Sequence, residues 1–436
     1  MRSALGRAAV SVYAFLTAWI LASYFFHYPI PEFTAKFLSL AAAAWLAYAL
    51  HSIGALLVWF AGWLVPIGWV DELGPWNARL FRSMAGFAAV TFVAAAFGMA
   101  GPGPYLVQLR VLFGFVVVAA LAGHVVGSKQ KAPAPRVGSA VSLAFMALPA
   151  AGMAAAFLSS FGPITHYDSL VYHLALPALY LREGRIASIP FNLYSAFPGG
   201  CETLYAFIMA SLPEPEYVIN LLGWALALVL GGAAAEWSGE LGGKRARSFS
   251  TALWWTTPAV LLLCQGGYVE LPLAAATFLA LRAFAAADGR AHAGAAMLFS
   301  GLFGGLALSI KYTGAITIVL LGAAAAVRLM RGPRAQRHAL AFAGAAAVTP
   351  APWLIKNAFS FGNPVFPFLY QWSGAAPGWA GETASRYFSM LTEYGARSNL
   401  LTDLLLLDPS SRGGFDVLGD FGWPLLLVGA VPALFL

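Results

Sequence analysis

Apolar segments about as long as a bilayer is thick recur along almost the whole chain, and they limit what it can fold into. A helix needs about 20 apolar residues to cross the hydrocarbon core. The 436 residues are 60% hydrophobic and only 10% charged, whereas a soluble domain carries about 25% charged residues. We therefore predict an all-α polytopic protein of a lipid bilayer, with about 12 or more transmembrane helices. The predicted spans are 9–27, 37–60, 83–100, 107–127, 137–158, 216–237, 249–265, 268–286, 294–310, 313–329, 338–355 and 422–436.

Basic residues gather in three loops, and they orient these spans. The runs SKQKAPAPR, GGKRARS and RLMRGPRAQR all fall on one side when the spans are counted from the N-terminus. Lys and Arg are enriched in cytoplasmic loops, so we place that side and the N-terminus in the cytoplasm. These loops explain the net charge of +7, and we find no nucleic-acid-binding motif. The polar segments on the opposite, extracytoplasmic side are 159–215, 264–271, Lys311–Tyr312 and 356–421.

The densest polar stretch is HYDSLVYHLALPALYLREGRI, residues 166–186. Ionisable side chains at a membrane boundary are costly and often mark functional sites. An interfacial helix here places Asp168 and Tyr172 on one face, four residues apart, and Pro177 would kink it. A carboxylate can accept the proton of a sugar hydroxyl as a bond forms, so Asp168 is the candidate general base, unless it only caps the helix. His173 either binds substrate or makes a structural hydrogen bond.

Two further acids lie in the predicted outer segments. Glu202 is in NLYSAFPGGCETLYAFIMASLP, which we expect to be a second interfacial helix or a partial re-entrant helix. Its carboxylate either faces a cavity or lies at the helix N-terminus, where the dipole favours it. Glu270 follows Tyr268 in CQGGYVELPL and begins a predicted span. Asp168 and Glu270 are the candidate catalytic acids, acting as base and orienter or holding a divalent cation together. The alternative is that Glu270 pairs with a nearby lysine only for assembly.

Lysines at the outer boundary supply the opposite charge. Lys311 and Tyr312 interrupt two apolar spans in GLALSIKYTGAITIV, and Lys356 lies in PWLIKNAFSFGNPVFPFLY. A fixed cation there would stabilise a phosphate leaving group, unless both lysines only extend to the interface. Nucleotide-binding loops are absent from the sequence, and apart from that divalent cation we predict no cofactor. The candidate substrate-binding residues are Tyr172, His173, Glu202, Tyr268, Lys311, Tyr312 and Lys356, and no metal ligand is assigned.

Four motifs occur in an order that resembles a known family. They are YDSLVYHLALPALYLREGRI, FPGGCETLYAFI, TTPAVLLLCQGGYVELPL, and the pair LSIKYTGA and PWLIKNAFSFGNPVFPF. Over about residues 137–370 the chain resembles bacterial GT-C glycosyltransferases, which include the protein mannosyltransferases, the lipid A aminoarabinose transferases and the Rgt-type lipopolysaccharide transferases. By this resemblance Asp168 matches the catalytic acid of the first outer loop. Glu270 falls where relatives usually carry aspartate.

The resemblance implies an activity, a location and a domain organisation. The expected reaction moves a sugar from a polyprenyl-phosphate donor to an envelope glycan, lipid or protein acceptor. The expected location is the bacterial inner membrane, with the active site on the extracytoplasmic side. Residues 1–136 would be extra N-terminal transmembrane helices, and 137–436 a GT-C-like catalytic module. The sequence ends in VGAVPALFL, inside an apolar run, so we expect this module to be truncated at its C-terminus.

The chain departs from the family, and two other classes of protein remain open. Many relatives begin directly with the helix that precedes the acidic loop, whereas four extra predicted spans, 9–127, come first here. Relatives also often carry two adjacent acids in that loop, whereas Asp168 stands alone. A transporter or flippase of lipid-linked sugars is the main alternative. Transporters favour midplane sites and internal repeats, but polar residues here collect at one face and no repeat is evident. A non-catalytic assembly subunit is the third possibility.

Overall fold

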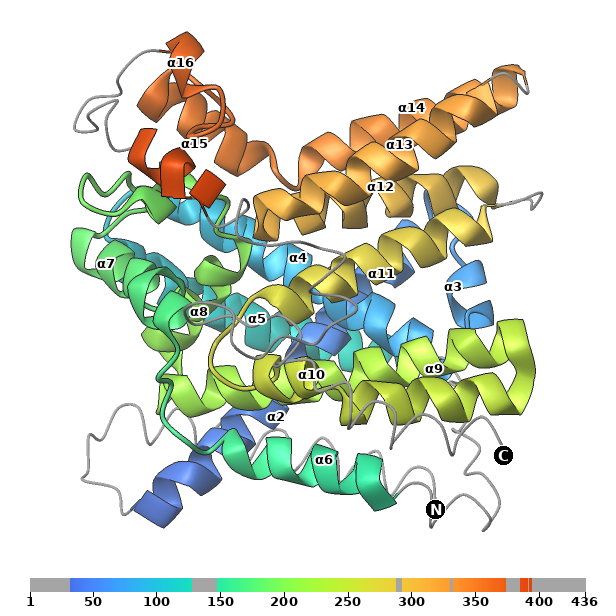
Figure 1. Cartoon of the computed structure of the whole chain (residues 1–436), viewed down its shortest axis with the longest axis horizontal. Coiled ribbons are helices and arrows are strands. Elements are labelled where there is room, and N and C mark those ends of the chain that lie inside the picture. Colours follow the sequence, from blue (N-terminus) through green and yellow to red (C-terminus); the bar gives the residue numbers. More distant parts are fainter. Residues whose placement is uncertain are drawn as a thin grey trace.

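Helices form nearly all of the regular structure, and the described part of the chain contains no strand. The all-α prediction is therefore confirmed. Among the residues that the structure describes, five helices are long and apolar enough to cross a membrane, or six if one bent pair counts as a single span, so the expectation of 12 or more spans is not confirmed. The computed structural model (Figure 1) describes residues 32–127, 147–287, 292–329, 332–373, 385–390 and 392–393.

The difference in span number has two sources. The predicted spans 9–27 and 422–436 lie outside the described residues, as does the first half of 137–158. Other apolar runs form helices of 13 to 17 residues, and at 1.5 Å per residue these are shorter than a hydrocarbon core of about 30 Å. The five long helices are α2 (Glu32–Ala61), α4 (Pro75–Ala100), α5 (Tyr105–Gly127), α9 (Pro215–Thr256) and α12 (Ala293–Ile310).

Helix α9 is a hairpin of two antiparallel arms, as Figure 1 shows. The chain reverses at Gly243, whose φ of 75° lies in the left-handed region that glycine adopts without strain. The Ser238 hydroxyl donates to the Ala246 carbonyl at 3.0 Å, and the Trp254 indole donates to the Ala227 carbonyl at 3.0 Å. The basic run GGKRARS thus forms the turn, and the first arm corresponds to the predicted segment 216–237. The second arm covers only the first half of the predicted segment 249–265, because the chain breaks at Thr257 and continues as α10 (Pro258–Leu263).

The N-terminal helices pack tightly on one another and on the rest of the protein. A Cβ atom on Gly86 of α4 would lie 1.8 Å from the Leu50 carbonyl oxygen of α2, and one on Gly123 of α5 would lie 1.9 Å from the Ser52 carbonyl oxygen. Small residues allow membrane helices this close approach. Asn77 of α4 donates to the Ala233 carbonyl of α9 at 3.2 Å. The described helices of 1–136 therefore share one core with those of the predicted catalytic module.

The first outer loop contains two short helices in place of the single interfacial helix that we expected. A π-helix, η2 (Ser169–His173), is followed by α7 (Ala175–Glu183). The break falls at Leu174, three residues before Pro177, which lies in the first turn of α7. Leu174 and Pro177 are buried within the protein, so they do not face lipid as the apolar side of an interfacial helix would. Because a π-turn is wider than an α-turn, it changes the directions of the side chains around Tyr172.

The next helix, α8 (Gly200–Ser211), lies inside the bundle (Figure 1). We expected an interfacial or re-entrant helix, but Cys201, Phe207 and Ile208 are fully buried. A short helix can sit there because α4, α5 and α7 pack around it. The remaining elements are α3 (Trp69–Glu72), α6 (Ala147–Ser159), η3 (Leu193–Ala196), α10 (Pro258–Leu263), α11 (Glu270–Ala286), η4 (Tyr312–Gly314), α13 (Ala315–Leu329), α14 (Pro333–Val348), α15 (Ala351–Phe361) and α16 (Tyr370–Ser373).

Candidate functional site

A cavity of about 220 Å³ brings together polar residues that are far apart in the sequence. Its walls come from the first outer loop, from the start of α8, from the end of α12 and from residues 385–390. Five of the predicted site residues line it. These are Asp168, Tyr172, His173, Glu202 and Lys311.

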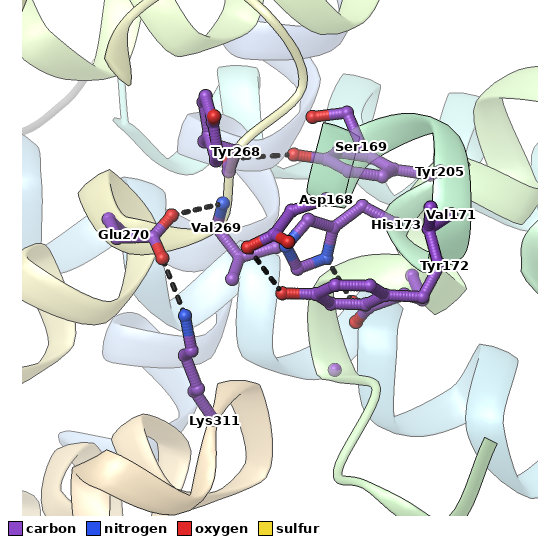
Figure 2. Close-up of polar contacts among 12 residues, drawn as sticks. Asp168, Ser169, Val171, Tyr172, His173, Tyr205, Tyr268, Val269, Glu270 and Lys311 are labelled. Carbon is purple, nitrogen blue, oxygen red and sulfur yellow. Dashed lines mark hydrogen bonds and ion pairs between the residues drawn. The ribbon is translucent and has the colours of Figure 1, made fainter. Parts of the chain in front are cut away.

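Asp168 is held by a neighbour on its own helix. The Tyr172 hydroxyl donates to Asp168 Oδ2 at 3.1 Å (Figure 2), so the predicted shared face is confirmed. The Asp168 side chain makes no capping hydrogen bond, which is contrary to the capping alternative. Burial, followed by the charges of Asp168 and Glu202, raises the pKa of Tyr172 far above its usual value. Tyr172 therefore stays a hydrogen-bond donor and leaves the second Asp168 oxygen available.

His173 and Glu202 form a buried pair beside Asp168. The distance from His173 Nδ1 to Glu202 Oε1 is 2.6 Å, and the side chains are 2% and 4% exposed. His173 Nε2 and Glu202 Oε2 have no hydrogen-bond partner within the described residues. When Nδ1 donates to Glu202, Nε2 of the neutral ring is an acceptor. Buried polar atoms are normally satisfied, so this wall suits a ligand hydroxyl or an ordered water. Glu202 lines the cavity and also lies in the first turn of α8. The two predicted alternatives, a carboxylate facing a cavity and a carboxylate at a helix N-terminus, are therefore both correct.

Lys311 and Glu270 form an ion pair where two helices meet. Lys311 follows the last residue of α12, and Glu270 is the first residue of α11. Lys311 Nζ lies 2.6 Å from Glu270 Oε1 (Figure 2), and the side chains are 30% and 29% exposed. Lys311 lines the cavity and Glu270 does not. Glu270 is therefore placed to orient Lys311, and its charge also acts on Tyr172.

Aromatic rings form a further wall that the sequence did not identify. Tyr194 stacks on Tyr172 with ring centroids 4.2 Å apart and an interplanar angle of 13°. Phe197 lies edge-on to Tyr194 at 5.4 Å and to Tyr387 at 5.9 Å. Burial raises the pKa of Tyr194 to about 12, so its hydroxyl is protonated at physiological pH. Such rings combine an apolar face with a polar edge, which suits a sugar ring.

Three predicted substrate-binding residues, Lys356, Tyr312 and Tyr268, lie outside the cavity. Lys356 of α15 is buried and donates to the Ser195 carbonyl, next to Tyr194. The Tyr312 hydroxyl donates to the Phe366 carbonyl at 2.9 Å. The Tyr268 carbonyl accepts from the Tyr205 hydroxyl at 3.1 Å, and Tyr268 lines a different, apolar cavity. None of the three lines the candidate site.

The sequence missed several lining residues, among them Tyr180, Tyr194, Phe197 and Tyr387. Their one available signal was aromatic side chains within the two long segments predicted to lie outside the membrane. The described residues contain no group of three or more His, Cys, Asp or Glu side chains that could hold a metal ion. Asp168 and Glu270 therefore have no third ligand of these types in the part of the chain that the structure describes.

Comparison with known proteins identifies no relative of this chain. No protein-family model, no curated protein and no solved structure matches the chain.

Proposed function

We propose that this protein is a GT-C-type glycosyltransferase that moves a sugar from a polyprenyl-phosphate donor to an envelope glycan, lipid or protein. We place it in the bacterial inner membrane, with the cavity on the extracytoplasmic side. The observation that carries the proposal is the placement of a carboxylate, Asp168, and a cation, Lys311, on the walls of one cavity. Several described helices are apolar and long enough to cross a membrane, and a lipid-linked donor is found in the bilayer that such helices require.

The proposed reaction replaces one bond at the anomeric carbon of the sugar with another. The acceptor oxygen forms a bond to this carbon while Asp168 takes its proton. The bond between the same carbon and the phosphate oxygen breaks, and polyprenyl phosphate leaves with the electron pair. Lys311 stabilises the negative charge that grows on the phosphate. Tyr172 and Glu270 act as positioning residues for Asp168 and Lys311, through the contacts of 3.1 Å and 2.6 Å.

The remaining polar wall explains how a sugar would be held during this reaction. His173 Nε2 and Glu202 Oε2 are acceptors without partners in the described chain, and sugar hydroxyls are donors. The stacked rings of Tyr172 and Tyr194 provide a flat apolar surface nearby. We therefore assign the donor sugar to this side of the cavity.

Purified protein in lipid tests the proposal with a panel of polyprenyl-phosphate sugars and a crude envelope-glycan acceptor. We expect wild type and Glu183→Gln to form glycosylated product and release polyprenyl phosphate, because Glu183 is an exposed acid of the neighbouring helix α7. Asp168→Asn should fold normally, as judged by its thermal unfolding, and form no product. Normal turnover by Asp168→Asn would refute the mechanism.

One observation favours the alternative class, a transporter or flippase of lipid-linked sugars. The helices α14 and α15 form a pair bent by 56°, and broken helices are common in transporters. We rank this second because the polar cavity residues come from segments predicted to lie at one face. If the protein in liposomes moved labelled lipid-linked sugar from one leaflet to the other without forming any glycosidic product, the ranking would be reversed.

A further inference from the structure

A second cavity, of about 310 Å³, lies between the N-terminal helices and α9, and the proposed chemistry does not use it. Apolar side chains form most of its walls, including Leu50 of α2, Met84 and Phe87 of α4, and Leu226 of α9. Empty apolar cavities of about 150 Å³ stay dry and take up apolar ligands. A cavity of twice that size in a membrane protein is therefore suited to hold part of a lipid.

The cavity follows one face of a helix. Ile219, Leu222, Leu226 and Val229 of α9 all line it, at the three- and four-residue spacing of neighbours on a helix face. From Ile219 to Val229 the helix rises about 15 Å. An unbranched hydrocarbon chain lying along α9 matches this shape.

One end of the cavity carries a cation. Arg79 lines the cavity, and Arg79 belongs to the end of α4 whose Asn77 bonds to Ala233, four residues beyond Val229. Within the described residues Arg79 has no carboxylate in ion-pair distance, and its guanidinium lies 5.2 Å from the Trp76 ring centroid. Its neighbour Arg82 is paired with Asp71.

Two further polar groups lie at this end. His51 Nδ1 and Ser83 Oγ are 3.3 Å apart, and both residues line the cavity. This end of the cavity thus combines hydrogen-bonding groups with a cation that has no carboxylate partner among the described residues. A half-buried cation in a membrane protein is costly unless it has an anionic partner, so the ligand needs a negative head as well as an apolar chain.

We propose that this cavity binds one anionic glycerophospholipid from the leaflet that Arg79 faces. The lipid phosphate contacts Arg79, and one acyl chain lies along α9 toward Gly267 and Tyr268. The bilayer itself supplies this ligand, and basic residues at a membrane surface attract anionic lipids. The site is distinct from the Asp168 cavity, because the two sets of lining residues share no member.

Native mass spectrometry of the purified full chain tests the proposal, with phosphatidylglycerol and phosphatidylcholine of identical acyl chains as probes. We expect one phosphatidylglycerol to bind more tightly than phosphatidylcholine. Arg79→Gln should weaken the binding of phosphatidylglycerol about fivefold, which is the contribution of one basic residue to the binding of anionic lipid at a membrane surface. Arg245→Gln, an exposed arginine at the α9 turn, is the matched control and should bind as wild type.

A second variant tests the apolar part of the site independently. Ala225 of α9 lines the cavity, and Ala225→Phe should fill it and abolish binding of both lipids without lowering the unfolding temperature. Equal affinity for the two lipids together with no effect of Arg79→Gln would overturn the proposal. Displacement of phosphatidylglycerol by polyprenyl phosphate at equal concentration would also overturn it, because the cavity would then hold the donor.

Discussion

Replacing Glu270 by glutamine removes the carboxylate partner of Lys311 and preserves the size of the side chain. Each side chain of the pair is about 30% exposed, so its contribution lies between two limits. Exposed ion pairs contribute about 0–1 kcal/mol, and breaking a buried pair costs about 3–5 kcal/mol. We therefore expect Glu270→Gln to lower the free energy of unfolding by about 1–2 kcal/mol.

The effect on turnover follows from the role given to Lys311. Loss of one group that stabilises a developing anion costs about 10²–10³ in kcat, which is the expectation for Lys311→Met. Glu270→Gln leaves the Lys311 cation in place but frees it to move. A loss of about 1.4 kcal/mol in its stabilisation of the phosphate corresponds to a fall of about tenfold in kcat. In the double variant the cation is absent, so loss of its orienting partner should add nothing further.

A double-mutant cycle measured on polyprenyl-phosphate release and on thermal unfolding checks this reasoning. The double variant Glu270→Gln/Lys311→Met should be no slower than Lys311→Met, because coupled residues are not additive. If Glu270→Gln lowers stability and leaves turnover at the wild-type rate, the pair serves assembly alone. Rate losses that simply multiply would mean that Glu270 does not act through Lys311.

Other parts of the structure give predictions that are independent of this pair. Tyr172→Phe removes the 3.1 Å hydrogen bond to Asp168 and keeps the ring stacked on Tyr194. Because a hydrogen bond to a charged group contributes about 1.5 kcal/mol or more, the free energy of unfolding should fall by about that amount, and turnover should fall about tenfold as Asp168 loses its positioning partner. A steady-state assay paired with thermal unfolding checks both. Gly86→Ala should destabilise the protein by about 1–3 kcal/mol, because its Cβ would lie 1.8 Å from the Leu50 carbonyl oxygen. Gly114→Ala faces open space and is the matched control; an equal loss of unfolding temperature in both would refute the close contact between α2 and α4.

Local patterns predicted those features that depend on neighbours in the sequence. The glycine-rich basic run reverses the chain at Gly243, and Lys311 separates α12 from α13, both as predicted. The contact of Asp168 with Tyr172 followed from a spacing of four residues. Each of these depends on a helical period or a chain-breaking residue, and both are visible in one sequence.

Features that depend on tertiary packing could not be predicted. The His173–Glu202 pair joins residues 29 positions apart, and no period relates them. Helix α8 reads as a half-polar interfacial segment, but the helices around it bury almost its whole surface. Several apolar runs that the pattern predicts to be spans form helices of 13 to 17 residues in the described part of the chain, because where a helix ends depends on its packing partners. The cavity wall at Tyr387 comes from the segment 356–421 predicted to lie outside the membrane, whose fold the sequence pattern does not specify.

Electron cryomicroscopy of Asp168→Asn in lipid, soaked with a polyprenyl-phosphate sugar that wild type uses, tests the central claim most directly. We predict that the sugar lies in the cavity between residue 168 and the stacked rings of Tyr172 and Tyr194, with its phosphate in contact with Lys311. A donor bound elsewhere, with this cavity filled only by water, would contradict the proposed active site.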